Sequence, residues 1–312
     1  MYNEEIKEQF FATFPEKSQY RTRTRLESIS TAEQNLGKDL TEFSDEDLRK
    51  WFSGFNWISS DAVRSCIADF GRYNRWAHST NQGFQFTDAI ERLDIRKDID
   101  FTRGIRALWL GSPDSLVSTV TRVYPIDEGY VALPALIFAW LGFTAGEAAQ
   151  IASKQVDCAQ RRVFMPSGAL YPYPIPEVFW EPLEVYAKTV ASERESNSSR
   201  KVYADDLGFF LRRMITEESK KSGEPYTSGL ISSSITNFSR QYEKRFHERI
   251  RFSYVTIIQS GRYYRLYQSE LSGVNLYAKE NKELVCELGK GKMAGDVLTI
   301  YEAYRAVFYP RS

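Results

Sequence analysis

Histidine is almost absent from this chain, whose 312 residues include only His78 and His247. Two imidazoles exclude most zinc sites and leave little for a mechanism that moves protons through several histidines. Cysteine is nearly as rare. Cys66, Cys158 and Cys286 lie far apart without a CxxC pair, which indicates a reducing compartment. We therefore expect no metal ion and no other cofactor.

Long apolar runs and net charge are missing too. No stretch approaches the ~20 apolar residues that a membrane-spanning helix needs, and the acidic start at residues 1–5 is unlike a signal peptide. These features predict a cytoplasmic protein with no membrane partner. The 41 Lys and Arg residues balance 41 Asp and Glu residues. This balance does not exclude nucleic-acid binding, which needs basic residues on one face rather than an overall excess.

What the chain does have is length and aromatic side chains. Its 312 residues suffice for two domains with separate cores, and 14% of them are aromatic, including 19 Tyr and 20 Phe. The apolar pattern repeats mostly at helical spacing, with a few short strand-like stretches. The sequence therefore predicts a mainly α fold with a small β-sheet, of the α+β class.

The first part, residues 1–80, has the pattern of a compact helical domain. Asn3 is expected to cap a first helix that Pro15 ends, and Gly37 to end the second. Ser44 and Ser59 precede two more amphipathic helices. Polar residues then indicate a connection over 81–104, and 105–312 form the second domain.

The second part alternates between helices and short extended stretches. An apolar helix over 130–140 is followed by a turn at Gly142 and a helix over 145–151. Strands are expected at 156–157 and 162–165, and 192–199 should be an exposed loop. Further helices are expected at 177–188, 202–220, 228–246, 253–270 and 296–308.

Basic residues gather at a few places. Seven lie between residues 240 and 265, against two acidic ones; they are Arg240, Lys244, Arg245, Arg249, Arg251, Arg262 and Arg265. A solvated helix face is the simpler interpretation of this charge alone. Helical spacing nevertheless places Arg240, Lys244 and Arg245 on one face, which suits a DNA backbone. Other candidate phosphate contacts are Arg21, Arg23, Arg25, Arg72, Arg75 and Lys290.

Several motifs, in order, resemble those of the tyrosine recombinases, or phage integrases. Residues 35–40 and 67–73 are typical of the core-binding domain. Residues 141–147 resemble the first-arginine segment, Thr-Gly-Leu-Arg-x-Ser-Glu, and 260–264 the second box, His-x-x-Arg-His. Leu-Gly-Lys at 288–290 resembles Leu-Gly-His. The resemblance implies a two-domain fold: an N-terminal helical, SAM-like core-binding domain and a C-terminal catalytic-like domain.

The catalytic residues of that family are mostly replaced. Thr144 stands where the first arginine is expected. Tyr263 stands where the second box has its final histidine, and Lys290 stands where the Leu-Gly-His motif has its histidine. Arg262 matches the second arginine, and Tyr301 lies near the place of the nucleophile, although packing is the favoured role for one of 19 tyrosines. The sheet lysine has no counterpart near Ser167. The resemblance therefore implies a degenerate, non-cutting member with no catalytic residues.

The resemblance implies double-stranded DNA as the partner, through phosphate and base contacts. Among integrase-like proteins with so depleted a site, the chain resembles lysogeny repressors of SPβ-type Bacillus prophages, which work in the bacterial cytoplasm on the nucleoid. Self-association on DNA and a phage-encoded regulatory protein stay open as partners, and the short tail after Tyr301 favours a monomer in solution. Two alternatives remain: an active recombinase using Tyr301, and an accessory protein of a recombinase.

Overall fold

The computed structural model describes residues 1–80, 84–189, 191–192, 201–203, 208–212, 214–216, 226–248, 250 and 252–310, without the side chains of the three short strands at 191–216. Contacts divide the chain into two compact units. Unit 1 comprises Met1–Ala107 with Gly295–Ser312, and unit 2 comprises Leu108–Ala294. The C-terminal segment therefore packs with the N-terminal residues.

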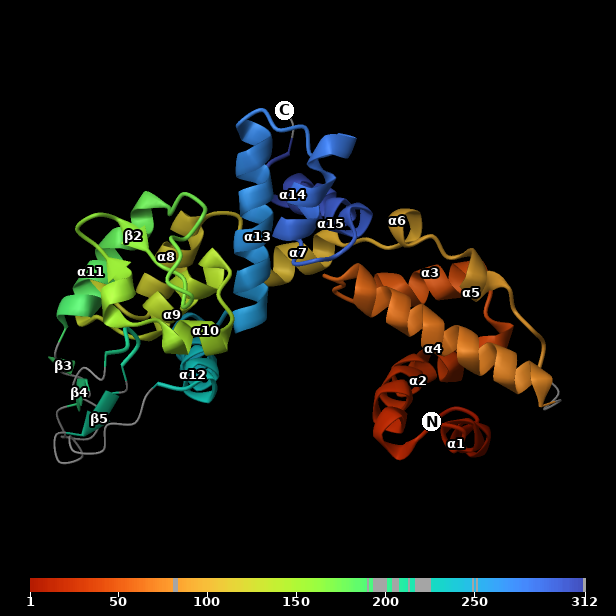
Figure 1. Cartoon of the computed structure of the whole chain (residues 1–312). Helices are drawn as coiled ribbons and strands as arrows, with labels where there is room; N and C mark the ends of the chain where they lie inside the picture. Colours follow the sequence, from red (N-terminus) through yellow and green to blue (C-terminus); the bar gives the residue numbers. More distant parts are fainter. Residues whose placement is uncertain are drawn as a thin grey trace. The chain divides into compact units, whose positions relative to one another are not determined.

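Unit 1 is built from helices, and Figure 1 shows them in their order along the chain. Four carry its N-terminal part: α1 (Glu4–Phe11), α2 (Glu16–Leu36), α3 (Asp45–Ser53) and α4 (Ser60–Ser79), with the 3-10 turn η1 (Leu40–Glu42) between the second and the third. Three shorter ones follow: α5 (Ala89–Arg92), α6 (Ile95–Asp98) and α7 (Thr102–Leu108). The last helix of the chain, α15 (Ala294–Phe308), completes the unit.

Local signals explain some of these helix ends. Ser44 forms a capping box with Asp47 at the start of α3, and Gly37 ends α2 with φ of 66°. Asn3 is the N-cap residue of α1 as expected, but its side chain forms no capping hydrogen bond and its side-chain NH2 donates to Asp39 at 2.9 Å. Pro15 directly precedes α2 rather than ending the first helix, which stops at Phe11.

An unusual polar network lies inside unit 1. Lys7 of α1 forms an ion pair with Glu33 of α2, and both side chains are fully buried. Glu33 also accepts from the Leu40 backbone N–H at 3.0 Å, and the hydroxyl of Tyr73 on α4 donates to Asp39 at 3.0 Å. The network ties α1, α2, η1 and α4 together through groups that are costly to bury without partners.

The C-terminal helix is held on unit 1 by charge and by packing. Arg64 of α4 donates to both carboxylate oxygens of Asp296, near the start of α15. Such a two-point pair fixes orientation as well as position. Further along α15, Tyr301 and Tyr304 are fully buried.

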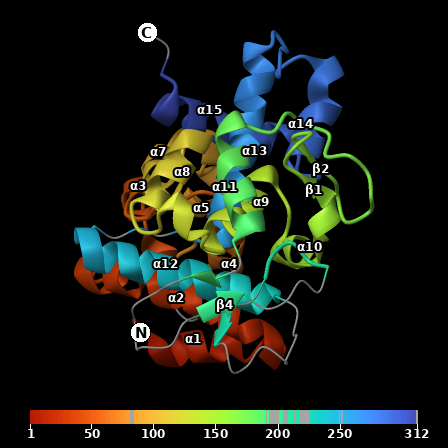
Figure 2. The same cartoon turned by 90° about the vertical axis from the view of Figure 1, so that its left-hand side faces the viewer.

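Unit 2 is organised around the apolar helix α9 (Ala132–Leu141), whose residues are all buried. Figures 1 and 2 place α13 (Tyr254–Leu271), α12 (Ser228–Phe246) and α11 (Trp180–Lys188) around it. The remaining helices are α8 (Pro113–Thr121), α10 (Ala145–Gln150) and α14 (Lys282–Leu288), with the 3-10 turns η2 (Ile126–Glu128), η3 (Ser153–Gln155), η4 (Glu177–Phe179) and η6 (Lys279–Asn281).

Two small antiparallel sheets complete unit 2. Strand β1 (Val156–Asp157) pairs with β2 (Arg162–Val163), as expected from the sequence. Strands β3 (Ala191–Ser192), β4 (Lys201–Tyr203) and β5 (Met214–Thr216) form the second sheet, in that order. The helix expected at 202–220 is therefore wrong, because β-branched residues pair across β4 and β5 (Val202 with Ile215). The loop expected at 192–199 lies outside the described residues after Ser192.

The mainly helical class is confirmed. The division into domains at 1–80, 81–104 and 105–312, with a recombinase-like second domain, stays a prediction. Its boundaries differ from the contact units, which place residues 295–312 with the N-terminal part. Among the described residues, no helix combines the length and hydropathy needed to cross a membrane.

Candidate nucleic-acid interface

A close crossing of α9 and α13 creates the platform of the site. A Cβ built on Gly261 of α13 would lie 1.9 Å from the carbonyl oxygen of Trp140, so only glycine fits there. The same carbonyl accepts a hydrogen bond from Nη1 of Arg265, one turn further along α13, at 2.7 Å. The crossing therefore determines both the spacing of the helices and the position of one basic side chain.

A glycine turn follows α9 and begins the next helix. Gly142 has φ of 96°, a left-handed conformation that suits glycine and ends α9. Thr144 then caps α10: its hydroxyl accepts from the Glu147 N–H at 3.2 Å, and the Thr144 N–H donates to the Glu147 carboxylate at 2.7 Å. Thr144 thus serves as a helix cap.

Lys290 approaches this turn from the segment after α14. Its backbone is left-handed, with φ of 54°, and its ammonium group donates to the carbonyl of Gly142 at 3.0 Å. Burial lowers the pKa of Lys290, and the positive charge of Arg262 lowers it further. Lys290 therefore reaches a site where positive charge is already concentrated.

Arg262 carries the most deeply buried charge of the site. Its side chain is 4% exposed and donates to the side-chain oxygen of Gln259 at 3.1 Å. Burial lowers the pKa of Arg262. Arg265 lies near it, with its guanidinium carbon 5.5 Å from the centre of the Tyr173 ring and a buried Nε that lacks a hydrogen-bond partner among the described residues.

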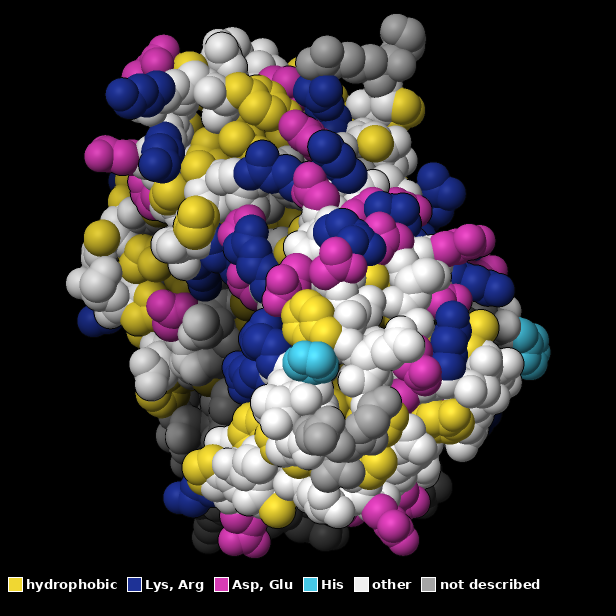
Figure 3. Space-filling view, turned by 90° about the vertical axis from the view of Figure 1, so that its right-hand side faces the viewer, with side chains coloured by type: hydrophobic (Ala, Val, Ile, Leu, Met, Phe, Trp, Pro, Cys, Tyr) yellow, Lys and Arg dark blue, Asp and Glu magenta, His cyan; other side chains and the backbone are white. Residues whose placement is uncertain are grey.

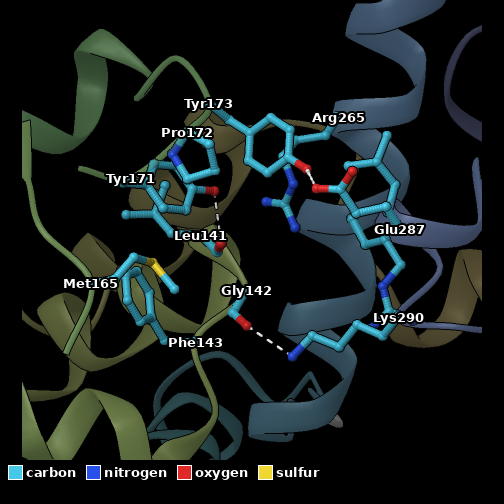
Figure 4. Close-up of a pocket in the computed structure, with 12 residues that line it drawn as sticks. Leu141, Gly142, Phe143, Met165, Tyr171, Pro172, Tyr173, Arg265, Glu287 and Lys290 are labelled. Atoms are coloured by element: carbon cyan, nitrogen blue, oxygen red, sulfur yellow. Dashed lines mark hydrogen bonds between the residues drawn. The ribbon is translucent and has the colours of Figure 1, made fainter. Parts of the chain in front are cut away.

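Arg262, Arg265 and Lys290 line one pocket of about 220 Å³. Figure 4 shows Lys290 reaching Gly142 from one side, and Tyr173 beside Arg265 with its hydroxyl on Glu287. The other wall is apolar and aromatic, and comes from the segment after β2; it includes Met165, Tyr171 and Pro172. None of the three cations forms an ion pair with an acidic side chain of the described residues. Glu287, which accepts from the Tyr173 hydroxyl, also lines the pocket, but the three cations outnumber it, which suits a bound oxyanion.

Two neighbours of Arg262 on α13 serve packing. Ser260 is buried, donates to the Thr256 carbonyl and accepts from the Leu110 N–H at 3.0 Å. Tyr263 is 4% exposed and stacks on Trp109 with ring centres 4.9 Å apart. Tyr263 is thus part of the interior of unit 2.

Tyr301 belongs to unit 1, whereas Arg262 and Lys290 belong to unit 2. Its side chain is fully buried among the residues that hold α15 in place. This burial agrees with the packing role that the sequence favours for Tyr301.

The basic residues of unit 1 differ in their availability. Arg21 is exposed. Arg23 forms a two-point ion pair with Glu8, and Arg25 bonds Asp69 and the Ser65 carbonyl. Arg72 and Arg75 are exposed. Nη1 of Arg72 lies 3.4 Å from Oδ1 of Asp69, and Nη1 of Arg75 lies 3.2 Å from Oε1 of Glu91. On the face displayed in Figure 3, basic and acidic side chains are interspersed.

The helix α12 carries a second group of exposed cations. Arg240, Lys244 and Arg245 are all exposed on it, as the helical spacing predicts. Arg249 and Arg251 lie outside the described residues. Sequence reasoning missed Arg122, which packs on the rings of Tyr242 and Phe246 on this helix, with its guanidinium carbon 4.0 Å from the centre of the latter. An isolated arginine between two helices gives no charge pattern that reveals it.

These observations define a mostly helical protein with a cation-lined pocket in unit 2 and a helical N-terminal region. Residues 1–79 match the family model described as MrpR, N-terminal core-binding domain. This is a tyrosine-recombinase-type N-terminal domain, and a core-binding domain implies DNA binding. No curated protein matches the chain.

Proposed function

We propose that the protein is a sequence-specific repressor that binds double-stranded DNA with an integrase-like fold and does not cut it. The observation that carries this proposal is the pocket of Arg262, Arg265 and Lys290, three cations without an acidic partner among the described residues. These cations outnumber the one acidic lining residue, Glu287, and a DNA phosphate supplies the balancing negative charge. Phosphate contacts give affinity, and side chains on base edges give specificity.

The turn beside this pocket argues against strand cleavage. In recombinases, two arginines hold the phosphate oxygens on which negative charge builds during the reaction. Here Thr144 is engaged as the cap of α10, so one of those donors is replaced by a helix start. Losing a single preorganised donor raises a barrier by about 3–4 kcal/mol. Losing most of a constellation that acts as a unit leaves little catalysis.

A protein that recognises its site without cutting it blocks polymerase when it is bound at a promoter. The resemblance to the master lysogeny repressor of SPβ-type Bacillus prophages leads us to propose repeated operators in a phage genome as targets, and prophage maintenance as the role. The exposed cations Arg21, Arg240 and Lys244 are the first candidates for additional backbone contacts. The alternative of an active recombinase requires Tyr301 to leave its buried position.

Arg262→Ala tests the phosphate contact. We expect DNA affinity to fall about 10-fold or more at all sequences, because a charge-assisted hydrogen bond to a buried guanidinium is lost. The plot of log affinity against log salt should become shallower by about one unit. The measurement is fluorescence anisotropy with labelled duplexes over a range of salt concentrations.

Two further variants make that experiment decisive. Arg262→Lys keeps the charge but not the planar fork, so it should lose affinity and keep the salt slope. Lys188→Ala removes a charge that pairs with Glu184 on the exposed face of α11, and should change neither quantity. An unchanged slope in a folded Arg262→Ala protein would remove Arg262 from the interface.

A further inference from the structure

A second pocket adjoins the cation-lined one. It has a volume of about 260 Å³ and shares four lining residues with its neighbour, namely Leu141, Tyr171, Tyr173 and Arg265. Small-molecule sites typically occupy about 300–1,000 Å³. The two pockets together come into this range, whereas neither does alone. Arg265 and Tyr173 line both, so a single ligand that spans the two would contact these side chains in its middle.

The walls of the second pocket are aromatic and rigid. Tyr264 of α13 lies with its ring centre 5.7 Å from that of Trp140, and Tyr173 provides a second ring. Pro174 and Pro176 stiffen the segment opposite α13. Flat faces of this kind accept the π-face of a nucleobase without regard to its identity.

The second pocket also offers polar groups at one edge. Gln268 of α13 lines it, and the Gln268 side-chain amide has no hydrogen-bond partner among the described residues. An amide both donates and accepts, so it is able to pair with the edge of a base. The hydroxyls of Ser269 and Ser272 donate to carbonyls of their own helix, at 3.0 and 2.9 Å, and retain accepting capacity.

We propose that these joined pockets bind a free nucleoside phosphate. Its phosphate lies against Arg262, Arg265 and Lys290, and its base lies between Tyr173 and Tyr264 with one edge on Gln268. The buried charge of Arg262, 4% exposed and bonded only to neutral Gln259 among the described residues, makes the phosphate end a built anion site. The second, aromatic pocket then favours a phosphate compound that also carries a flat group with hydrogen-bonding atoms over inorganic phosphate.

Such a ligand regulates the protein by competition. This step rests on the proposed function, because the cations that hold the nucleotide phosphate are those assigned to a DNA phosphate. One pocket cannot hold both phosphates at once, so a nucleotide weakens DNA binding and relieves repression by mass action.

The test uses the full chain and isothermal titration with AMP, GMP, CMP and UMP, their nucleosides, and inorganic phosphate. We expect at least one nucleotide to bind at least 10-fold more tightly than its nucleoside and than phosphate. Tyr264→Leu and Gln268→Ala should weaken nucleotide binding about 10-fold and about threefold respectively. Leu271→Ala, at an exposed position of the same helix, should leave it unchanged. Anisotropy with a mixed-sequence duplex at low salt should show displacement by the nucleotide.

The outcomes separate this inference from the proposed function. If no nucleotide binds better than phosphate, or a folded Tyr264→Leu protein binds nucleotide normally, the nucleotide site is overturned. A duplex affinity that still depends on Arg262 in that case leaves the DNA-binding proposal standing. Tight nucleotide binding by a protein with no duplex affinity would support the site and overturn the proposed function instead. Nucleotide binding that leaves the duplex in place would overturn the competition.

Discussion

Gly261→Ala is expected to destabilise unit 2 by about 3 kcal/mol, the upper part of the usual range for overpacking a core. The added Cβ would lie 1.9 Å from the Trp140 carbonyl oxygen, a backbone atom that moves only if α9 and α13 separate. Separation also disturbs the bond from Arg265 to that carbonyl, so the cation-lined pocket loses its geometry. Thermal unfolding should show a midpoint lower by about 6–12 °C, and DNA affinity should fall with it.

Gly146→Ala is the matched control. Gly146 lies in α10, and a Cβ built there meets no atom within 4 Å. Alanine is the better helix former, so this variant should be neutral or gain up to about 1 kcal/mol. If Gly261→Ala unfolded at the same temperature as Gly146→Ala, the close crossing of α9 and α13 would not be what positions the site.

Lys7→Met is expected to cost unit 1 about 3–5 kcal/mol at neutral pH. Lys7 and Glu33 are both fully buried, so removal of the lysine leaves a buried carboxyl that must either keep its charge without a counter-charge or take up a proton. The methionine replaces the aliphatic part of the side chain and adds no large cavity. Chemical unfolding followed by circular dichroism measures the loss.

The loss should depend on pH in a defined direction. Burial raises the pKa of Glu33 from 4.5 to about 7, while the attraction of Lys7 opposes the rise. A raised folded-state pKa means that the stability from this group is complete below its unfolded pKa of about 4.5 and is lost as pH rises through about 7. Without Lys7 the pKa of Glu33 rises further, so the deficit of the variant should be larger at about pH 8 than at about pH 5.

Lys38→Met provides the comparison for a partly exposed pair. Lys38 pairs with Asp47 at 2.7 Å, with side chains 32% and 16% exposed. Loss of this pair should lower the free energy of unfolding by no more than about 1 kcal/mol, because water screens the two charges and solvates the Asp47 carboxylate that remains. Equal losses in the two variants would show that the Lys7–Glu33 pair is not desolvated in the folded protein.

Much of the helical framework follows from the sequence. The helices expected at 228–246 and 253–270 are found as α12 and α13, and Gly37 and Ser44 mark helix ends because their local chemistry is sufficient. The strands β4 and β5 were not predicted, since three-residue strands are defined by their pairing partner rather than by periodicity. The helix α14 (Lys282–Leu288), two turns long, has too few residues to show a period.

The candidate site, like the fold, follows from the sequence only in part. Motif order and charge predict Arg262, Arg265 and Lys290 as DNA contacts, and the structure places all three around one pocket. The place of Lys290 on the Gly142 carbonyl depends on residues 148 positions apart in the chain, which no local pattern reports. The capping role of Thr144 follows from its spacing to Glu147, a Thr-x-x-Glu capping box that the sequence already contains. The pairing of Lys7 with Glu33 similarly needs the packing of α1 on α2.

The most direct test of the account is selection of DNA by the purified protein. Fragmented phage and host DNA are mixed with it at near-physiological salt, and the retained fragments are sequenced and examined for protein attached covalently. The account predicts enrichment of a short repeated motif, with the DNA recovered intact. Fragments recovered only as covalent adducts, abolished by Tyr301→Phe, would contradict it in favour of a recombinase. No enrichment at all would contradict it in favour of an accessory protein.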